Sequence, residues 1–157
     1  MDSLSHQLKS AIAEEEPRLR ALAEEPPGAG SGWTKKQELG HLIDSATNNR
    51  ARFIKAALEG ELTGPTYDGN GWVELGGYNE MSWAAVIDLW KALNQALAPV
   101  LDRIPADRLN AQCRVASAPA VTLRFLIEDY ILHMRHHLDH ILSREHMTAY
   151  PGAAIGV

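Results

Sequence analysis

Residues 123–141 have the sequence LRFLIEDYILHMRHHLDHI, and this stretch decides the fold. Projected at about 100° per residue, its apolar side chains fall on one arc of a helix. That arc holds Leu123, Ile127, Tyr130, Ile131, Met134, Leu138 and Ile141. The preceding Thr122 has a hydroxyl that can accept a hydrogen bond from the first turn, as helix N-caps do. We therefore predict an amphipathic helix from Thr122 to about Arg144, with one face in a core.

Two segments near the start of the chain show the same helical period. The first runs from about residue 3 to residue 24, and Pro17 inside it removes a hydrogen bond, so we expect a kink or a split there. The second runs from Thr34 to about residue 60. Thr34 and Gln37 match a capping box, in which each side chain bonds to the backbone of the other residue. Both segments are predicted to be helices.

A third upstream helix is predicted to begin at the N-cap Ser82. Long segments rich in turn residues, 61–81 and 104–120, separate these helices and show no sustained apolar period. Residues 146–157 are interpreted as a tail. The sequence therefore predicts an all-α protein, a four-helix bundle with long connecting loops, almost no strand and a single domain over residues 1–157.

The composition excludes several classes of protein. The chain has 157 residues, 45% of them apolar and 22% charged, as in globular proteins. Its net charge of −5, without a basic block, argues against nucleic-acid binding. The single Cys113 cannot form an intramolecular disulfide, and no apolar run reaches the length of a membrane span. Because the N-terminus also lacks a signal-peptide pattern, we expect a cytoplasmic protein. The absence of a basic block favours a small-molecule substrate over a nucleic acid.

Histidines are concentrated at the end of the chain. Five of the seven are His133, His136, His137, His140 and His146. His133 and His137 lie at the margin of the apolar arc, and imidazoles four residues apart on a helix can converge on one metal ion. An isolated pair of this kind is equally compatible with partly buried, hydrogen-bonded histidines. His136 and His140 have the same spacing but point further from the arc, so we expect them to be exposed.

A metal site would need a third ligand from another helix, because catalytic sites commonly have three protein ligands and an open position. His41 is the only histidine of the predicted 34–60 helix. In projection it lies opposite the apolar arc, on a stripe with Ser45, Asn48 and Arg52. Such a stripe lines a polar cavity or faces water, and general exposure preferences favour water.

Other chemistries fit less well. A di-iron bundle needs two Glu-x-x-His units, and only Glu38-x-x-His41 has that form. No His-Glu-x-x-His motif of a zinc protease is present. Cys113 precedes Arg114, yet a lone cysteine is more often an inert apolar residue than an activated thiolate. Trp72, within the 61–81 segment, is a candidate wall of a ligand pocket.

Three stretches resemble a known family. Residues 33–44, WTKKQELGHLID, followed by Asn48-Asn49 and Arg52, look like the second helix of the DinB/YfiT-like metalloenzymes. Residues 129–138, DYILHMRHHL, look like the last helix of that family, and residues 67–72, YDGNGW, match its long loop. The resemblance covers roughly residues 33 to 142.

The resemblance implies a four-helix bundle, often dimeric, in which three histidines bind a divalent metal, commonly zinc or nickel. Carried over by motif position, the ligands are His41, His133 and His137. We accordingly expect a homodimer. The family also implies a metal-dependent enzyme that either hydrolyses a small substrate or transfers a low-molecular-weight thiol such as bacillithiol, mycothiol or glutathione to a small electrophile.

Of these two reactions we favour thiol transfer, because three neutral imidazoles leave the charge of the metal intact to stabilise a thiolate. Arg52 is a candidate for binding an anionic substrate, and Asp129, one turn before His133, is a candidate for orienting that ring. The alternative is a non-catalytic bundle, in which the histidines bind a structural metal or none and the protein works as a ligand-binding or dimerisation module.

Overall fold

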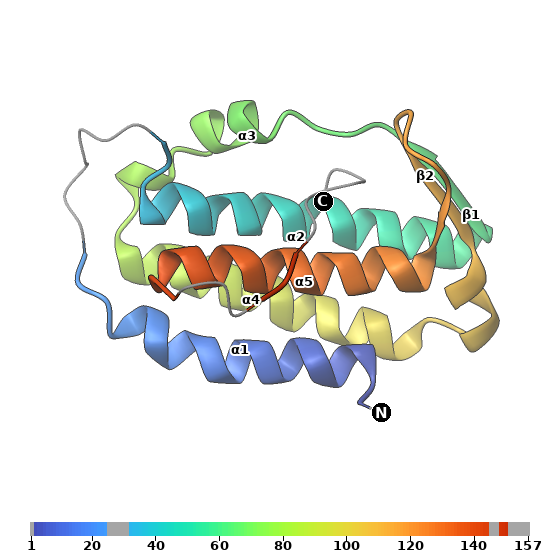
Figure 1. Ribbon diagram of the computed structural model, residues 1–157, viewed down its shortest axis with the longest axis horizontal. Helices are drawn as coiled ribbons and strands as arrows, with labels where there is room; N and C mark the ends of the chain where they lie inside the picture. Colours follow the sequence, from blue (N-terminus) through green and yellow to red (C-terminus); the bar gives the residue numbers. More distant parts are fainter. Residues whose placement is uncertain (1, 25–31, 145–147, 151–157) are drawn as a thin grey trace.

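The computed structural model describes residues 2–24, 32–144 and 148–150, and four long helices dominate it (Figure 1). They are α1 (Leu4–Arg20), α2 (Lys35–Glu59), α4 (Trp83–Arg103) and α5 (Leu123–Ile141). Helix α1 packs against α4 and α5, and α2 packs against the same two helices from the other side. The predicted four-helix bundle is therefore confirmed. No helix within the described ranges is both long enough and apolar enough to cross a bilayer.

The ends of the helices follow from local hydrogen bonds. Thr34, Ser82 and Thr122 each accept a bond from the backbone three residues later, as predicted. The Gln37 side chain in turn accepts a bond from the backbone N–H of Thr34, which completes the capping box. Pro17 does not split α1, which continues through it and ends at Arg20. A proline only one turn from the end of a helix removes a single hydrogen bond, so the helix ends soon afterwards instead of breaking.

The core fills the space between the four long helices. Apolar side chains from all four are almost fully buried, including Leu8, Leu19, Leu39, Leu42, Phe53, Ile87, Trp90, Leu97, Leu123, Leu126, Ile127 and Tyr130. Leu123, Ile127 and Tyr130 of α5 come from the predicted arc and Leu126 lies at its margin, so the helical period correctly identified the face of α5 that enters the core.

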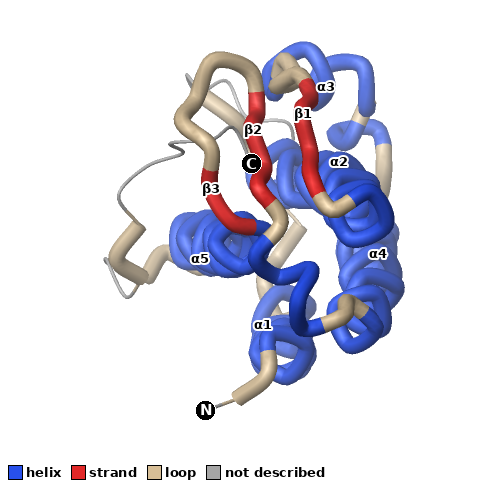
Figure 2. The backbone as a smooth tube through the Cα atoms, turned by 90° about the vertical axis from the view of Figure 1, so that its right-hand side faces the viewer, coloured by secondary structure: helices blue, strands red, loops and turns tan. Residues whose placement is uncertain are grey.

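The connecting segments are more ordered than predicted. They contain three short strands, β1 (Glu61–Gly64), β2 (Gln112–Val115) and β3 (Val121–Thr122). Strand β2 lies in the middle, parallel to β1 and antiparallel to β3, and the sheet lies beside the end of the bundle where α2 ends and α5 begins (Figures 1 and 2). The prediction of almost no strand is wrong because strands of two to four residues are too short to show an alternating pattern.

The segment between β1 and α4 lies along the outer side of α2 (Figure 1). It contains the short helix α3 (Gly69–Gly76) and a turn of 3-10 helix, Tyr78–Glu80. Gly40 of α2 makes this close packing possible, since a Cβ there would lie 2.1 Å from the ring of Tyr78. Helix α2 is therefore covered on two sides, by the bundle and by this segment.

Candidate metal centre

Three histidines converge between α2 and α5. His41 comes from α2, and His133 and His137 come from successive turns of α5. One ring nitrogen of each lies within 4.8 Å of the other two, and the Nε2 atoms of His41 and His133 are 3.1 Å apart. The structure thus brings together the three residues that the sequence motifs indicated.

The burial of His41 corrects one interpretation of the sequence. Only 8% of His41 and 3% of His133 is exposed, although general exposure preferences favoured water for the stripe of α2 that carries His41. The ring of His41 packs against that of Trp33, at 4.8 Å between centroids, and lies beside Gly69 of α3, where a Cβ would be 3.8 Å from it. Because the segment after β1 covers this side of α2, His41 and Ser45 of the polar stripe are buried, whereas Asn48 and Arg52 are half-buried.

Burial keeps the imidazoles in the form that binds metals. Loss of hydration lowers the pKa of His41 to about 4 and, with a contribution from neighbouring histidines, that of His133 to about 2. Both rings are neutral at pH 7 and need no deprotonation before binding an ion. Their buried Nδ1 atoms have no hydrogen-bond partner among the described residues. Two neutral imidazoles with unsatisfied nitrogens, beside a third imidazole, fit a divalent metal cation.

Glu38 holds the third histidine. Its carboxylate oxygen accepts a hydrogen bond from Nδ1 of His137 at 2.9 Å and another from Nδ1 of His140 at 3.2 Å. Because a carboxylate only accepts, Nδ1 of His137 carries a proton, and Nε2 is the ring nitrogen that could bind a metal. Sequence reasoning missed this role of Glu38, although its position three residues before His41 on one helix was a usable signal.

The outer histidine pair lies beside this cluster, because the rings of His136 and His140 are 5.5 and 6.0 Å from that of His137 between centroids. His140 is exposed, and His136 is half-buried, more than predicted. Their rings pack against each other at 4.4 Å between centroids, and neither joins His41. Burial, with the proximity of His140, lowers the pKa of His136.

Arg52 and Asp129, the two residues predicted to assist the site, lie at different positions relative to the three histidines. Arg52 is 11 residues beyond His41 on α2, or about 16 Å along the helix axis. Its guanidinium donates to the carbonyl of Pro65. Asp129 is buried, and burial raises its pKa, but its carboxylate accepts a bond from Tyr150 and none from Nδ1 of His133.

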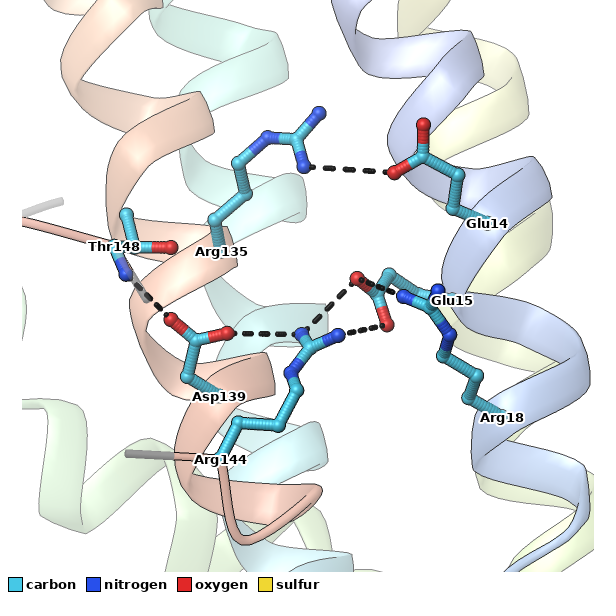
Figure 3. Close-up of polar contacts among 7 residues, drawn as sticks. All are labelled: Glu14, Glu15, Arg18, Arg135, Asp139, Arg144 and Thr148. Atoms are coloured by element: carbon cyan, nitrogen blue, oxygen red, sulfur yellow. Dashed lines mark hydrogen bonds and ion pairs between the residues drawn. The ribbon is translucent and has the colours of Figure 1, made fainter. Parts of the chain in front are cut away.

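Tyr150 is a neighbour of the cluster that the sequence did not reveal. Its ring lies against His133 and His136, at 5.7 and 5.5 Å between centroids. The chain is anchored nearby, because the backbone N–H of Thr148 donates to the buried carboxylate of Asp139 (Figure 3). Residues 148–150 therefore pack on α5 and are not a free tail, whereas the rest of the predicted tail lies outside the described residues.

Arg144 strengthens this anchor. Its guanidinium binds Glu15 of α1 through two nitrogens and Asp139 of α5 through one, and both carboxylates are almost fully buried (Figure 3). These ion pairs join α1 and α5 to Arg144, which follows α5 in the chain and precedes Tyr150.

Cys113 and Trp72 are the remaining candidate residues from the sequence, and the structure places one in the core and the other in a groove. Cys113 is fully buried, and burial raises the pKa of its thiol, which favours the inert interpretation. Trp72 is 41% exposed and lines a groove beside α2, in agreement with its predicted role as a pocket wall.

The fold and the three converging imidazoles define a four-helix-bundle protein with a candidate metal centre at one end of its core. The sequence model of the DinB superfamily matches residues 7–141, and the chain belongs to that superfamily.

Two curated relatives carry the name "putative metal-dependent hydrolase". The one from Oceanobacillus iheyensis is 29% identical over 112 residues, which is 71% of this chain and 64%, less than two thirds, of that protein. The one from Bacillus cereus is 26% identical over 143 residues, covering 91% of this chain and 80% of the relative.

Two solved structures have a similar fold. YfiT from Bacillus subtilis, described as having an unusual four-helix bundle topology, aligns with a TM-score of 0.74 at 23% identity, over 93% of this chain and 87% of that one. A variant of mycothiol-dependent maleylpyruvate isomerase aligns with a TM-score of 0.71 at 13% identity, over 96% of this chain and 65% of that one. At these identities the two alignments establish the fold alone.

Proposed function

We propose that this protein is a metal-dependent enzyme that transfers a low-molecular-weight thiol to a small electrophile. The observation that carries the proposal is the convergence of three imidazoles, from His41, His133 and His137, between α2 and α5, with the first two buried. A divalent cation held by these three residues supplies the positive charge that lowers the pKa of a thiol or a water bound beside it.

The chain's own residues support this chemistry in three ways. The ligand set contributes no negative charge, so it favours binding of an anionic nucleophile. Glu38 fixes the ring orientation and the tautomer of His137. Trp33 and Tyr150 pack against His41 and His133 and exclude water from those sides of the cluster.

Hydrolysis is the second candidate, and the names of the two curated relatives favour it. It requires the same cluster, with water in place of the thiol as the nucleophile. The two candidates therefore differ in the nucleophile and in the product formed, and not in the residues that hold the metal.

Metal content of five single variants tests the site. We expect His41→Ala, His133→Ala and His137→Ala to abolish stoichiometric zinc or nickel binding, because two imidazoles hold an ion much less firmly than three. His136→Ala and His140→Ala, which remove an equally spaced pair from the same helix, are the matched controls and are expected to retain it. Retained metal in His41→Ala would contradict the proposed ligand set, and loss in His136→Ala with retention in His133→Ala would select the other pair.

Product analysis tests the reaction. The zinc- or nickel-loaded protein is incubated with monochlorobimane and each of bacillithiol, mycothiol and glutathione, and the thioether conjugate is measured by mass spectrometry. We expect conjugation with one of these thiols and its loss in His133→Ala. Metal-dependent hydrolysis of ester or amide substrates without any thiol would support the second candidate. A metal-loaded protein inactive in both assays would overturn both candidates in favour of the non-catalytic module.

A further inference from the structure

A groove with a volume of about 420 Å³ lies between α2 and the segment that follows β1. This volume is within the range of small-molecule sites. Asn48, Arg52 and Lys55 line it from α2, and Tyr67 and Trp72 line it from the covering segment. The groove does not include the three histidines, so it is a separate feature of the fold.

The charge of the groove is opposite to that of the chain. The chain has 20 acidic and 15 basic residues, yet two cations, Arg52 and Lys55, line the groove, and no Asp or Glu within the described ranges does so. A concave surface lined by charges of one sign attracts ligands of the other sign. The groove therefore fits a small anion.

The aromatic side chains define the rest of the ligand. The guanidinium of Arg52 is held by the carbonyl of Pro65 at 3.0 Å and lies 5.7 Å from the centre of the Tyr67 ring. Tyr67 in turn packs edge to face against Trp72, which is partly exposed in the groove. A positioned guanidinium beside aromatic rings suits a carboxylate carried on an apolar or aromatic body.

The groove and the metal centre lie under one covering segment. His41, Asn48 and Arg52 share a stripe of α2, and Arg52 is about 16 Å from His41 along the helix axis. Gly69, between Tyr67 and Trp72 in the chain, lies beside His41, because a Cβ on Gly69 would be 3.8 Å from that ring. A molecule of about five residues' length, at about 3.5 Å per extended residue, spans this separation.

We propose that this groove binds the carboxylate end of a small organic anion whose reactive end lies at the three-histidine cluster. Binding of the carboxylate is inferred from the groove alone, whereas the position of the reactive end at the histidines rests on the proposed function. The carboxylate can belong to the electrophile or to the thiol, and the two sources present the same group to Arg52 and Lys55.

Titration of the zinc-loaded protein with phenylacetate, followed by NMR at the indole N–H of Trp72, tests the proposal. Phenylacetamide has nearly the same shape without the charge. We expect phenylacetate to shift the Trp72 signal saturably and to bind at least tenfold more tightly than phenylacetamide, as expected when a charge-assisted contact is lost. Equal binding of the two probes, or no binding of phenylacetate, would overturn the proposal.

Variants of α2 supply the control. Arg52→Gln and Lys55→Gln are each expected to weaken phenylacetate binding, the former at least tenfold, whereas Arg50→Gln, at an exposed position of the same helix, is expected to leave it unchanged. Unchanged binding in both groove variants would refute the site, and Lys55→Gln keeps the test decisive if Arg52→Gln does not fold.

Competition with S-methylglutathione, whose blocked sulfur cannot form a thiolate, identifies the source of the carboxylate. Displacement of phenylacetate would show that the groove accepts glutathione, and no displacement would exclude glutathione as the source of the carboxylate. None of these titrations measures turnover or metal content. A failed groove and a failed metal centre are therefore distinguishable.

Discussion

Acidification is expected to destabilise the metal-free protein through two buried histidines. Burial lowers the pKa of His41 to about 4 and that of His133 to about 2, against about 6.5 in an unfolded chain. Below pH 6.5 the unfolded chain binds protons that these folded rings exclude, so the free energy of unfolding decreases as the pH falls. The stability contributed by the two neutral histidines is fully present above pH 6.5 and is lost progressively as the pH falls toward their folded pKa values.

The magnitude follows from these pKa values. At pH 5 both folded rings remain mostly neutral while their unfolded counterparts are charged, which costs about 2 kcal/mol for each histidine relative to pH 7. The two together predict a loss of about 4 kcal/mol, a large share of the stability of an ordinary domain.

Urea denaturation with a chelator present, followed by circular dichroism at pH 7, 6 and 5, measures this loss. The matched control is the double variant His41→Gln/His133→Gln, in which neither side chain titrates. Burial raises the pKa of Asp44 and of Asp129, but these carboxylates are common to both proteins and cancel in the comparison. We expect the variant to lose about 4 kcal/mol less than the wild type. The same loss in both proteins would refute the argument from buried neutral imidazoles.

Three further predictions concern the anchor, the metal and the assembly. Arg144→Met leaves the buried carboxylates of Glu15 and Asp139 without their shared cation and is expected to cost about 3 to 5 kcal/mol in urea denaturation. Arg18→Met removes only an exposed partner of Glu15 and is expected to cost less than about 1 kcal/mol, so equal costs would contradict a structural anchor. Glu38→Gln is expected to weaken zinc affinity by about 10 to 100-fold in a competition titration, and unchanged affinity would remove the orienting role. We propose a homodimer, for which light scattering should give about twice 17.3 kDa, and a mass near 17.3 kDa would contradict it.

The sequence by itself determined the parts of this protein that depend on local interactions. The N-caps Thr34, Ser82 and Thr122 and the period of the apolar residues specify where the long helices begin and which face of α5 is buried. The spacing of His133 and His137 also places two ligands on adjacent turns of one helix, whatever packs against it. These features involve residues three or four apart, and a helix fixes their geometry.

Only the tertiary structure decided the features that join distant residues. Projection of α2 alone could not decide whether His41 lines a polar cavity or faces water, because it could not show that the segment after β1 returns across that face and buries it. Glu38 and His137 are 99 residues apart, and their hydrogen bond exists only when α2 and α5 pack together. Tyr150 likewise reaches His133 through contacts that follow α5, and not through any helical spacing. Pairwise contacts of this kind depend on how whole elements pack, which the periodicity of one segment does not contain.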